Sequence, residues 1–395
     1  MAQPRFGEFV ALVALLMATV AYSVDAMLPL LPIIGEELSP QDPAEAHKVI
    51  LVFMAGLGLG TFVMGPLSDA LGRRRLLLGG LAVYMAAAVA AALAQDLTTL
   101  LVARFVQGLG ASAPRVIAQA LVRDQFQGRM MARVLSFSTT LFTLVPAIAP
   151  FMGALLGHAF GWPAIFWSFV VFGAILSTWI ALRQPETLPP ERRRPLAVAT
   201  LWEGLRMVLS HRQVRLYLAA LTLTFTLMLL WISSVASIFD ESFDRVDSFP
   251  AWFAAAALLS APSSLLNARL VLRLGMARLI GVALGAQVAS ALLMLGLWPM
   301  VAGDAAFALF MGFMLVQFFS HGFLIGNLYA LALEPMGHVA GMTASVMGGV
   351  STVGAALIAG ALAALHDGTP VPLALASLAC LIPAMGVMAW ARRLA

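Results

Sequence analysis

The feature that most constrains this chain is its succession of apolar stretches. About a dozen of them are 18 residues or longer, and together they occupy most of the 395 residues. A helix rises about 1.5 Å per residue, so stretches of that length match the roughly 30 Å hydrocarbon layer of a bilayer. Only 11% of the residues are charged, against about a quarter in soluble domains. The chain is therefore predicted to be an all-α polytopic membrane protein.

The apolar stretches predict twelve transmembrane helices. They are placed at residues 9–34, 47–68, 76–95, 98–121, 134–158, 163–182, 214–239, 249–268, 277–300, 304–331, 342–365 and 371–391. An even number of spans puts both termini on one side of the membrane. The chain is accordingly expected to be a multi-pass protein of a bacterial inner (cytoplasmic) membrane.

The basic residues indicate which side that is. Of the 23 lysines and arginines, 19 fall on the side of the termini: Arg5, Arg73, Arg74, Arg75, Arg123, Arg129, Arg133, Arg183, Arg192, Arg193, Arg194, Arg206, Arg212, Arg215, Arg269, Arg273, Arg278, Arg392 and Arg393. Lys48 and Arg245 fall opposite, while Arg104 and Arg115 lie inside a span. By the positive-inside rule, both termini are expected in the cytoplasm. The net charge of +4 is thus a topology signal and does not indicate a nucleic-acid partner.

A polar, proline-rich stretch from Arg183 to Arg212 divides the chain into halves of six spans each. The predicted organisation is a six-helix bundle over 1–183, a cytoplasmic linker over 184–212 and a second six-helix bundle over 213–395. A weak internal repeat supports it, because a shift of 203 residues places Gly72 on Gly275. Such pseudo-symmetric halves are common in secondary transporters, where the substrate site lies between the halves near the midplane.

Asp25 is the only charge in the apolar run from Phe9 to Ile34. A carboxylate at membrane depth is costly unless it faces a cavity, finds a partner or takes up a proton. Every other acid in the chain lies near a span end or in a loop. Asp25 is therefore the candidate proton acceptor.

The second and third spans are joined by a loop that contains Gly65, Asp69, Gly72, Arg73 and Arg74. Its glycines permit a tight turn, and its aspartate can accept hydrogen bonds from the arginines. An ordinary positive-inside loop would explain the arginines alone. The spacing of the glycines and the aspartate is more particular than that.

This loop resembles the G-x-L-x-D-x-x-G-R-R signature of the major facilitator superfamily. The resemblance implies the twelve-helix fold of that family, and it implies that Asp69 and Arg73 belong to a cytoplasmic latch holding the outward-facing state. The second half departs from the signature, with Leu272 in place of the aspartate and Met276 in place of an arginine. No equivalent latch is expected there.

The fourth span carries Arg104 six residues from its periplasmic end, followed by Gln107, Gly108 and Gly110. Snorkelling to the surface, roughly 9 Å away, is one explanation for an arginine at this position. The stretch also resembles the R-x-x-Q-G-x-G motif of proton-coupled antiporters, which implies a part for Arg104 in proton transfer. Asp25 is similarly deep, so the first and fourth spans are expected to present the two charges to each other.

The fifth span contains Pro146, Pro150 and Gly153. Two prolines four residues apart are expected to bend the helix, and a generic kink packed through small residues is one interpretation. The segment also resembles the G-P-x-x-G antiporter motif, although Ala149 replaces a usual glycine. Together with Asp25 and the Arg104 motif, it makes the chain similar to the Bcr/CflA branch of drug:proton antiporters.

Several polar and aromatic residues are candidates for a substrate cavity. Gln317 and His321 lie four residues apart on one helical face, although hydrogen bonding between helices would explain them equally well. Methionine and aromatic side chains suit varied drug shapes, although core packing is the simpler explanation for each one. The candidates are Tyr22, Gln107, Arg115, Met228, Trp231, Gln317 and His321.

The sequence thus favours a proton-coupled exporter of small hydrophobic compounds that works by alternating access, without a cofactor or metal and as a monomer. A transporter of a metabolite such as an amino acid or sugar, by export or uptake, is the alternative. An intramembrane enzyme is disfavoured, because the spans contain no H-E-x-x-H, no G-x-S-x-G and no acidic pair. The single cysteine, Cys380, excludes a cysteine-built metal site.

Overall fold

The computed structural model of the protein describes residues 5–126, 130, 134, 138, 144–193 and 198–393. These residues form helices joined by turns and short loops, with no strand among them. Arg129, Arg133, Arg194 and most of 134–143, the first part of the predicted fifth span, lie outside the described residues. The chain divides into two compact units, Met1–Leu201 and Trp202–Ala395.

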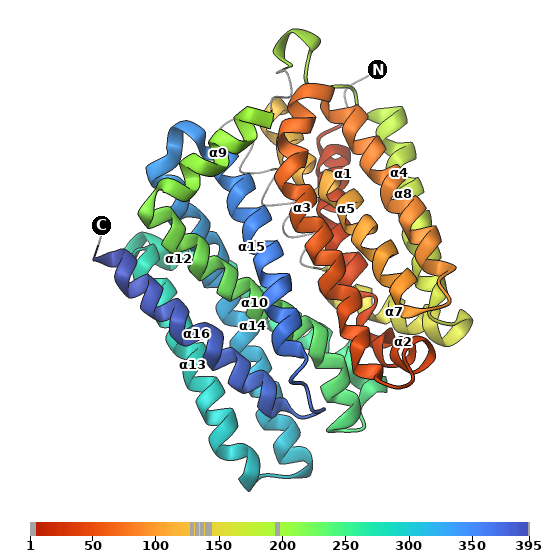
Figure 1. The fold of residues 1–395 in the computed structure, drawn as a ribbon, viewed down its shortest axis with the longest axis vertical. Coiled ribbons are helices and arrows are strands. Elements are labelled where there is room, and N and C mark those ends of the chain that lie inside the picture. Colours follow the sequence, from red (N-terminus) through yellow and green to blue (C-terminus); the bar gives the residue numbers. More distant parts are fainter. Residues whose placement is uncertain are drawn as a thin grey trace. The chain divides into compact units, whose positions relative to one another are not determined.

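The first unit is built from long helices that run side by side, coloured red to yellow-green in Figure 1. Its elements are α1 (Phe6–Asp25), η1 (Leu28–Leu30), α2 (Leu31–Leu38), η2 (Pro43–His47), α3 (Lys48–Leu71), α4 (Arg73–Ala92), α5 (Leu97–Gln125), α7 (Val145–Phe160), α8 (Pro163–Arg183) and η3 (Pro190–Arg192). The helix α9 (Val198–Ser210) connects this unit to the next.

The second unit, green to blue in Figure 1, is also helical throughout. Its elements are α10 (Arg212–Glu241), η4 (Val246–Ser248), α11 (Phe249–Ser260), α12 (Pro262–Leu274), α13 (Met276–Leu297), η5 (Trp298–Met300), α14 (Gly303–Leu333), η6 (Glu334–Val339), α15 (Ala340–Ala363) and α16 (Pro370–Arg392).

Membrane-length helices account for the fold. Among the described residues, 10 helical segments are long and apolar enough to cross a membrane. The 29-residue α5, which carries Arg104 and Arg115, and the shorter apolar α7 complete the twelve predicted spans. The prediction of a twelve-helix all-α membrane protein is confirmed.

The first span differs from the prediction because it is not one continuous helix. The α-helix α1 ends at Asp25, and a 3-10 turn at Leu28–Leu30 leads into α2. Pro29 and Pro32 lack the backbone N–H that a continuing helix would need, and each disfavours helical geometry in the residue before it. The proline positions therefore place a helix end at the acidic residue.

Matching turns occur at Gly72 and Gly275. Gly72 lies between α3 and α4 with φ at 96°, and Gly275 lies between α12 and α13 with φ at 77°. Each backbone N–H donates to the carbonyl four residues earlier, from Gly72 to Ser68 and from Gly275 to Val271. Only glycine adopts this positive φ without strain. The repeat found in the sequence thus corresponds to the same turn in both halves.

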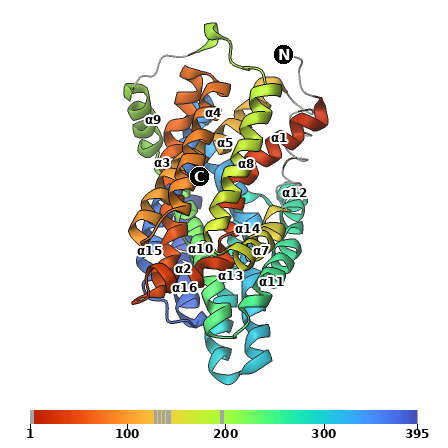
Figure 2. The same cartoon turned by 90° about the vertical axis from the view of Figure 1, so that its right-hand side faces the viewer.

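Glycines also bring α3 and α5 into close contact, which fixes the position of Arg104. A Cβ atom on Gly56 of α3 would lie 2.1 Å from the Phe105 carbonyl oxygen, and one on Gly108 of α5 would lie 2.1 Å from the Phe53 carbonyl oxygen. Neither position tolerates a side chain unless the helices separate. The two helices lie side by side together with α4 (Figure 2).

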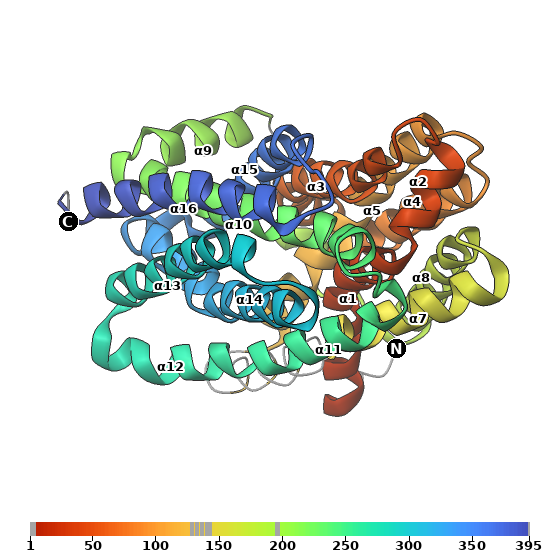
Figure 3. The ribbon, with the colours of Figure 1, turned by 90° about the horizontal axis from the view of Figure 1, so that it is seen from below.

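In the second unit, α10 and α14 pack against each other and against neighbouring helices, with α13 and α16 alongside (Figure 3). The centre of this packing is aromatic. Trp231 is fully buried, with its ring centroid 4.8 Å from that of Phe313 and 5.7 Å from that of Phe310. Rings at these distances add to the stability that burial of their area provides.

Candidate functional site

Asp25 is the last residue of α1 and is only 6% exposed. Among the residues that the structure describes, none donates a hydrogen bond to its carboxyl group or forms an ion pair with it. A buried acid without a counter-charge is costly as an anion, and taking up a proton removes that cost. The position therefore has the surroundings expected of a proton acceptor.

Arg104 lies in α5 and is fully buried. Its guanidinium group donates three hydrogen bonds, to the Gln107 side-chain oxygen at 2.7 Å, to the Ser23 carbonyl at 3.0 Å and to the Val49 carbonyl at 3.3 Å. Its Cζ atom also lies 4.3 Å from the centroid of the Phe53 ring. Its hydrogen-bond partners are therefore all neutral groups of α1, α3 and α5.

The bond to Ser23 has a structural meaning because the last carbonyls of a helix lack partners within it. The N–H of Ala26 donates to Tyr22 and the N–H of Met27 donates to Val24, which leaves the Ser23 carbonyl between them. Arg104 donates to that carbonyl, and a cation is favourable at this negative end of the helix dipole. Arg104 therefore caps α1 where it breaks.

The expected pairing of Asp25 with Arg104 is not present. The two residues do belong to packed helices, as their similar depth suggested, but Arg104 binds the backbone two residues before Asp25 instead of the carboxylate. The physical reason is the broken helix, which exposes a carbonyl to the guanidinium group. Snorkelling is also excluded for Arg104, since its side chain is fully enclosed.

Ser23 connects a third helix to this position. Its hydroxyl donates to the Thr19 carbonyl at 2.6 Å, and the Tyr84 hydroxyl of α4 lies 2.6 Å from the Ser23 oxygen, to which it donates. Tyr84 is fully buried. Sequence reasoning missed both residues, because a serine and a tyrosine in apolar spans carry no distinctive spacing. The end of α1 is thus held by α4 and α5 together.

Gly153 brings α7 against the same place. A Cβ atom on Gly153 would lie 1.8 Å from the carbonyl oxygen of Ala26, the residue after Asp25. Only a glycine allows this approach. Pro150 lies inside α7, whereas Pro146 occupies its first turn, where a proline does not bend the described helix. The predicted double kink therefore reduces to a single internal proline.

The remaining first-unit candidates lie in different surroundings. Tyr22 points toward α8, where its hydroxyl lies 2.8 Å from that of Ser168 and its ring packs on Phe169. Gln107 is fully buried and accepts from Arg104. Arg115 is half-buried in α5, next to the internal Pro114. Gln107 thus belongs with Arg104, while Tyr22 contributes to packing between α1 and α8.

The loop between α3 and α4 forms a compact polar network around Arg73, which is 3% exposed. The guanidinium group lies 2.6 Å from an Asp69 carboxylate oxygen and 3.1 Å from one of Asp124 in α5, and it also donates to the Ser68 hydroxyl. Because Arg73 is buried, this pairing is less screened than a surface ion pair. Asp124, near the end of α5, supplies the second carboxylate of this pairing.

Glu186 extends this network to the segment that follows α8. One carboxylate oxygen accepts from the Arg73 N–H at 2.9 Å and the other from the Arg74 N–H at 3.2 Å. These are unpaired N–H groups of the first turn of α4, where an anion is favourable. The Arg74 side chain donates to the Ala181 carbonyl of α8 at 2.6 Å. The loop is therefore fastened to the start of the linker.

The second-unit candidates divide into an aromatic and a polar group. Trp231 is enclosed by rings and its indole N–H is buried without a partner among the described residues, while Met228 is half-buried. Gln317 and His321 lie in α14 and contact α13 and α10. Gln317 is fully buried and its side-chain oxygen has no partner among the described residues.

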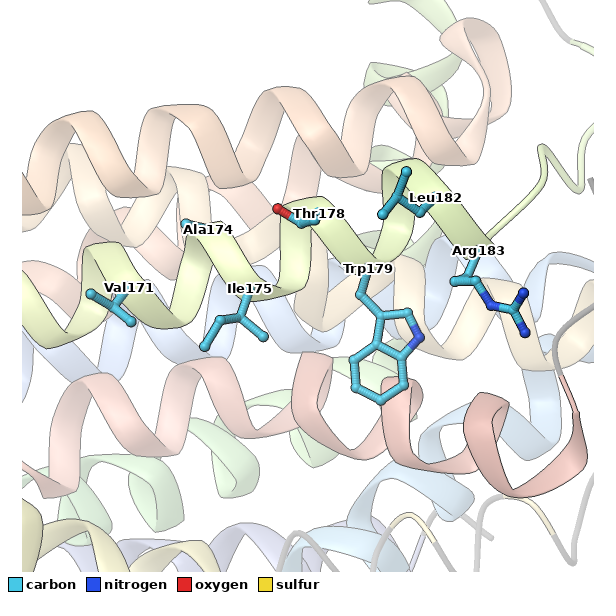
Figure 4. Close-up of a pocket in the computed structure, with 7 residues that line it drawn as sticks. All are labelled: Val171, Ala174, Ile175, Thr178, Trp179, Leu182 and Arg183. Atoms are coloured by element: carbon cyan, nitrogen blue, oxygen red, sulfur yellow. The ribbon is translucent and has the colours of Figure 1, made fainter.

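A shallow groove of about 540 Å³ runs along α8. Its lining comes from that helix alone and is mostly apolar: Val171, Ala174, Ile175, Thr178, Trp179, Leu182 and Arg183 (Figure 4). At its end Arg183 donates to the Glu8 carboxylate at 2.7 Å and 2.9 Å. None of the candidate cavity residues lines it.

Apolar helices that account for twelve spans in two units, with buried charges inside the first, define a polytopic helical membrane transporter. Comparison with known proteins assigns the family. The model described as Major Facilitator Superfamily matches residues 12–359, and the chain belongs to that superfamily. It is a transporter and not an enzyme.

Two curated relatives are similar over most of their length. The bicyclomycin resistance protein homolog of Haemophilus influenzae is 26% identical over 382 residues, covering 95% of this chain and 93% of that protein. The multidrug resistance protein MdtL of Klebsiella pneumoniae is 28% identical over 346 residues, covering 85% and 83%. Both names support membership of the drug-exporter part of the superfamily.

Among solved structures, the human organic anion transporter MFSD10 (TETRAN) superimposes with a TM-score of 0.68. The match covers 98% of this chain and 99% of that one, at 19% sequence identity. At that identity the likeness concerns the fold, which is the major facilitator fold.

Proposed function

We propose that this transporter is a proton-coupled exporter of small hydrophobic, drug-like compounds, with Asp25 as the proton acceptor and alternating access as the mechanism. One observation carries the proposal: Asp25 is buried at the break of α1 without a counter-charge among the described residues. The names of the relatives support drug-like compounds as the substrate class.

The contacts around Asp25 support a coupling between its charge and the conformation of the helices. Arg104 caps the carbonyl of Ser23, and Gly153 of α7 lies against the carbonyl of Ala26. Asp25 lies between Ser23 and Ala26 in the chain, so a change in its charge alters the electrostatic field at the end of α1, where both contacts are made. Arg104 acts in this proposal as a positioning residue for the acidic site.

The energetics of the proposal are sufficient for export. One proton crossing 100 mV contributes about 2.3 kcal/mol, and one pH unit adds about 1.4 kcal/mol. The sum of about 3.7 kcal/mol sustains a concentration ratio of several hundred-fold for a neutral substrate. No cofactor is needed besides the proton gradient, and substrate, protons and lipid suffice as partners of a monomer.

The test compares proton-driven accumulation with substrate exchange in proteoliposomes. Asp25→Asn is expected to abolish accumulation driven by a pH gradient while retaining exchange of labelled for unlabelled compound, because exchange requires no net proton movement. Asp42→Asn, at an exposed acid in the loop after α2, is the matched control and should behave as wild type. Full proton-driven accumulation by Asp25→Asn would refute the proposal.

We propose that the protein lies in the inner membrane of a bacterial cell, with both termini in the cytoplasm. The distribution of 19 of 23 basic residues supports it. Arg393→Cys in a Cys380→Ala background gives a single thiol near the C-terminus. It should resist a membrane-impermeant thiol reagent in whole cells and react in inverted vesicles. Labelling in whole cells would contradict the topology.

The loop network around Arg73 fits a conformational latch, the role that the family resemblance implies for Asp69 and Arg73. The support is the burial of Arg73 between the carboxylates of Asp69 and Asp124. Removing one of these carboxylates should shift the balance between conformations, because it weakens the pairing of a buried charge.

A further inference from the structure

A second polar cluster lies in the other unit, with Gln287 and Thr224 buried and His321 half-buried, and the function proposed above does not use it. It comprises His321 of α14, Gln287 of α13 and the backbone carbonyl of Thr224 of α10, each from the middle part of its helix. His321 Nδ1 lies 2.8 Å from the Gln317 carbonyl oxygen, and Nε2 lies 3.3 Å from the Thr224 carbonyl oxygen. Both ring nitrogens therefore face acceptors.

A carbonyl oxygen only accepts hydrogen bonds, and a neutral imidazole carries one N–H. A neutral ring therefore leaves one nitrogen lone pair directed at a carbonyl oxygen. The imidazolium form carries an N–H on each nitrogen and donates to both carbonyls. The two carbonyl contacts thus match the protonated ring.

Gln287 can donate a hydrogen bond to Nδ1 when the ring is neutral and Nδ1 carries no proton. Its side-chain nitrogen lies 3.4 Å from His321 Nδ1 and donates to the Gln317 carbonyl at 3.1 Å. When Nδ1 is unprotonated, this amide N–H is a donor for its lone pair. The side-chain oxygen of Gln287 is buried and has no partner among the described residues. A half-turn of the amide exchanges these two atoms, which would present that oxygen to an Nδ1–H.

A reciprocal bridge holds Gln287 in place. The side-chain nitrogen of Gln317 donates to the Gln287 carbonyl at 3.1 Å and to the Ser290 hydroxyl at 3.0 Å. Gln287 in turn donates to the Gln317 carbonyl. This bridge couples α13 and α14 beside the ring, so a change at His321 reaches both helices.

No charged side chain among the described residues contacts this cluster. Nine residues, about 13 Å of helix, separate Thr224 from Arg215 and Gln287 from Arg278. Tyr217 lies seven residues from Thr224 along α10, and Tyr329 lies eight residues from His321 along α14. The other titratable or charged groups on the helices packed around the cluster are Arg212, Asp240, Glu241, Arg269, Arg273, Asp304, Cys380 and Arg392. Within the described residues, the groups that contact His321 are therefore neutral amides and carbonyls.

We propose that His321 is a second proton-binding site of the transporter, which gains a proton at Nδ1 and loses it again during each transport cycle. Protonation forms one N–H bond, breaks one O–H bond of a hydronium ion from the aqueous phase with release of water, and adds one positive charge to the second unit. Ionisable residues at membrane depth are functional by default, since their burial is costly. The proposal goes beyond Asp25 coupling and rests on the proposed function only for its transport readout.

The direct test needs no transport. The protein with ¹⁵N-labelled histidine rings is titrated from pH 5 to pH 8, the range in which histidine changes charge. His321→Gln identifies the resonance among the six histidines, and His158→Gln, at an exposed site, is the control. The His321 signal is expected to change from the neutral to the imidazolium pattern. A signal that stays neutral, or stays charged, over the whole range overturns the proposal.

A second variant keeps the histidine in case His321→Gln does not fold. Gln287→Glu places a carboxylate beside Nδ1, and the His321 signal is then expected to stay in the imidazolium pattern over the whole range. The absence of any effect of this variant would contradict the proposed part of Gln287.

The transport readout is the substrate ratio at equilibrium under a gradient of one pH unit without membrane potential. One proton per neutral substrate sustains about a tenfold ratio and two sustain about a hundredfold. His321→Gln is expected to reduce the ratio from about hundredfold to about tenfold. If wild type and His321→Gln give equal ratios, His321 is no coupling site. If wild type forms no gradient, the proposed function fails, and the titration alone decides on His321.

Discussion

The capping of α1 by Arg104 makes a quantitative prediction for Arg104→Gln. The arginine donates to the carbonyls of Ser23 and Val49 and to the Gln107 side chain, and all three bonds are buried. A glutamine reaches at most one of these acceptors, so two charge-assisted bonds are lost. At about 1.5–3 kcal/mol each, the expected loss in free energy of unfolding is about 3–6 kcal/mol. At roughly 2–4 °C per kcal/mol for a unit of this size, the Tm should fall on the order of 10 °C.

Thermal unfolding in detergent, followed by tryptophan fluorescence, measures this change. Arg104→Lys keeps the charge but not the planar group that donates in several directions, so it should lower the Tm nearly as much. Arg245→Gln is the control, because Arg245 is 37% exposed and its pairing with Asp304 at 2.5 Å is a surface contact worth less than about 1 kcal/mol. The capping argument is refuted if Arg104→Gln lowers the Tm no more than Arg245→Gln, or if Arg104→Lys matches wild type.

Three further predictions concern contacts that position the site. Gly153→Ala should lower proton-driven accumulation and cost about 1–3 kcal/mol of stability, because its Cβ would lie 1.8 Å from the Ala26 carbonyl oxygen. Gly285→Ala is the control and should match wild type, because a Cβ at that position has open space around it. Glu186→Gln removes the charge that caps the first turn of α4, so a cysteine introduced at exposed Leu71 should react faster with a thiol reagent. Unchanged labelling of that cysteine would contradict the latch. Hydrogen bonds from the Thr99 side chain and backbone hold the pKa of Asp96 below its usual range. The stability that this carboxylate contributes is therefore present above its ordinary pKa near 4 and is lost as the pH falls through its lower folded-state pKa. Asp96→Asn should accordingly flatten the acidic limb of a plot of Tm against pH.

Much of the fold could be predicted because apolar length and basic asymmetry are local properties of the sequence. Twelve spans follow from the thickness of the bilayer, and the glycine turn at Gly72 follows from a residue that permits positive φ. The break of the first span was visible in Pro29 and Pro32 but was not predicted, because the apolar run itself continues without interruption.

The contacts of Arg104 could not be predicted from depth. Equal depth on two helices places Asp25 and Arg104 at one level, but it does not give the rotation of either helix about its axis. Close packing through Gly56 and Gly108 sets that rotation and directs the guanidinium group at backbone carbonyls. Glu186 was missed for a related reason, since a loop acid becomes a helix cap only when the chain folds back onto it.

By itself the sequence determined the class of protein, the number of spans and the single acid at membrane depth, because each depends on hydrophobicity summed along a segment. Only the tertiary structure decided which groups meet: Asp25 without a counter-charge, Arg104 on the end of α1, and His321 between two carbonyls. Hydrogen bonds depend on distances of about 3 Å between residues far apart in the chain, and a one-dimensional pattern does not specify those distances.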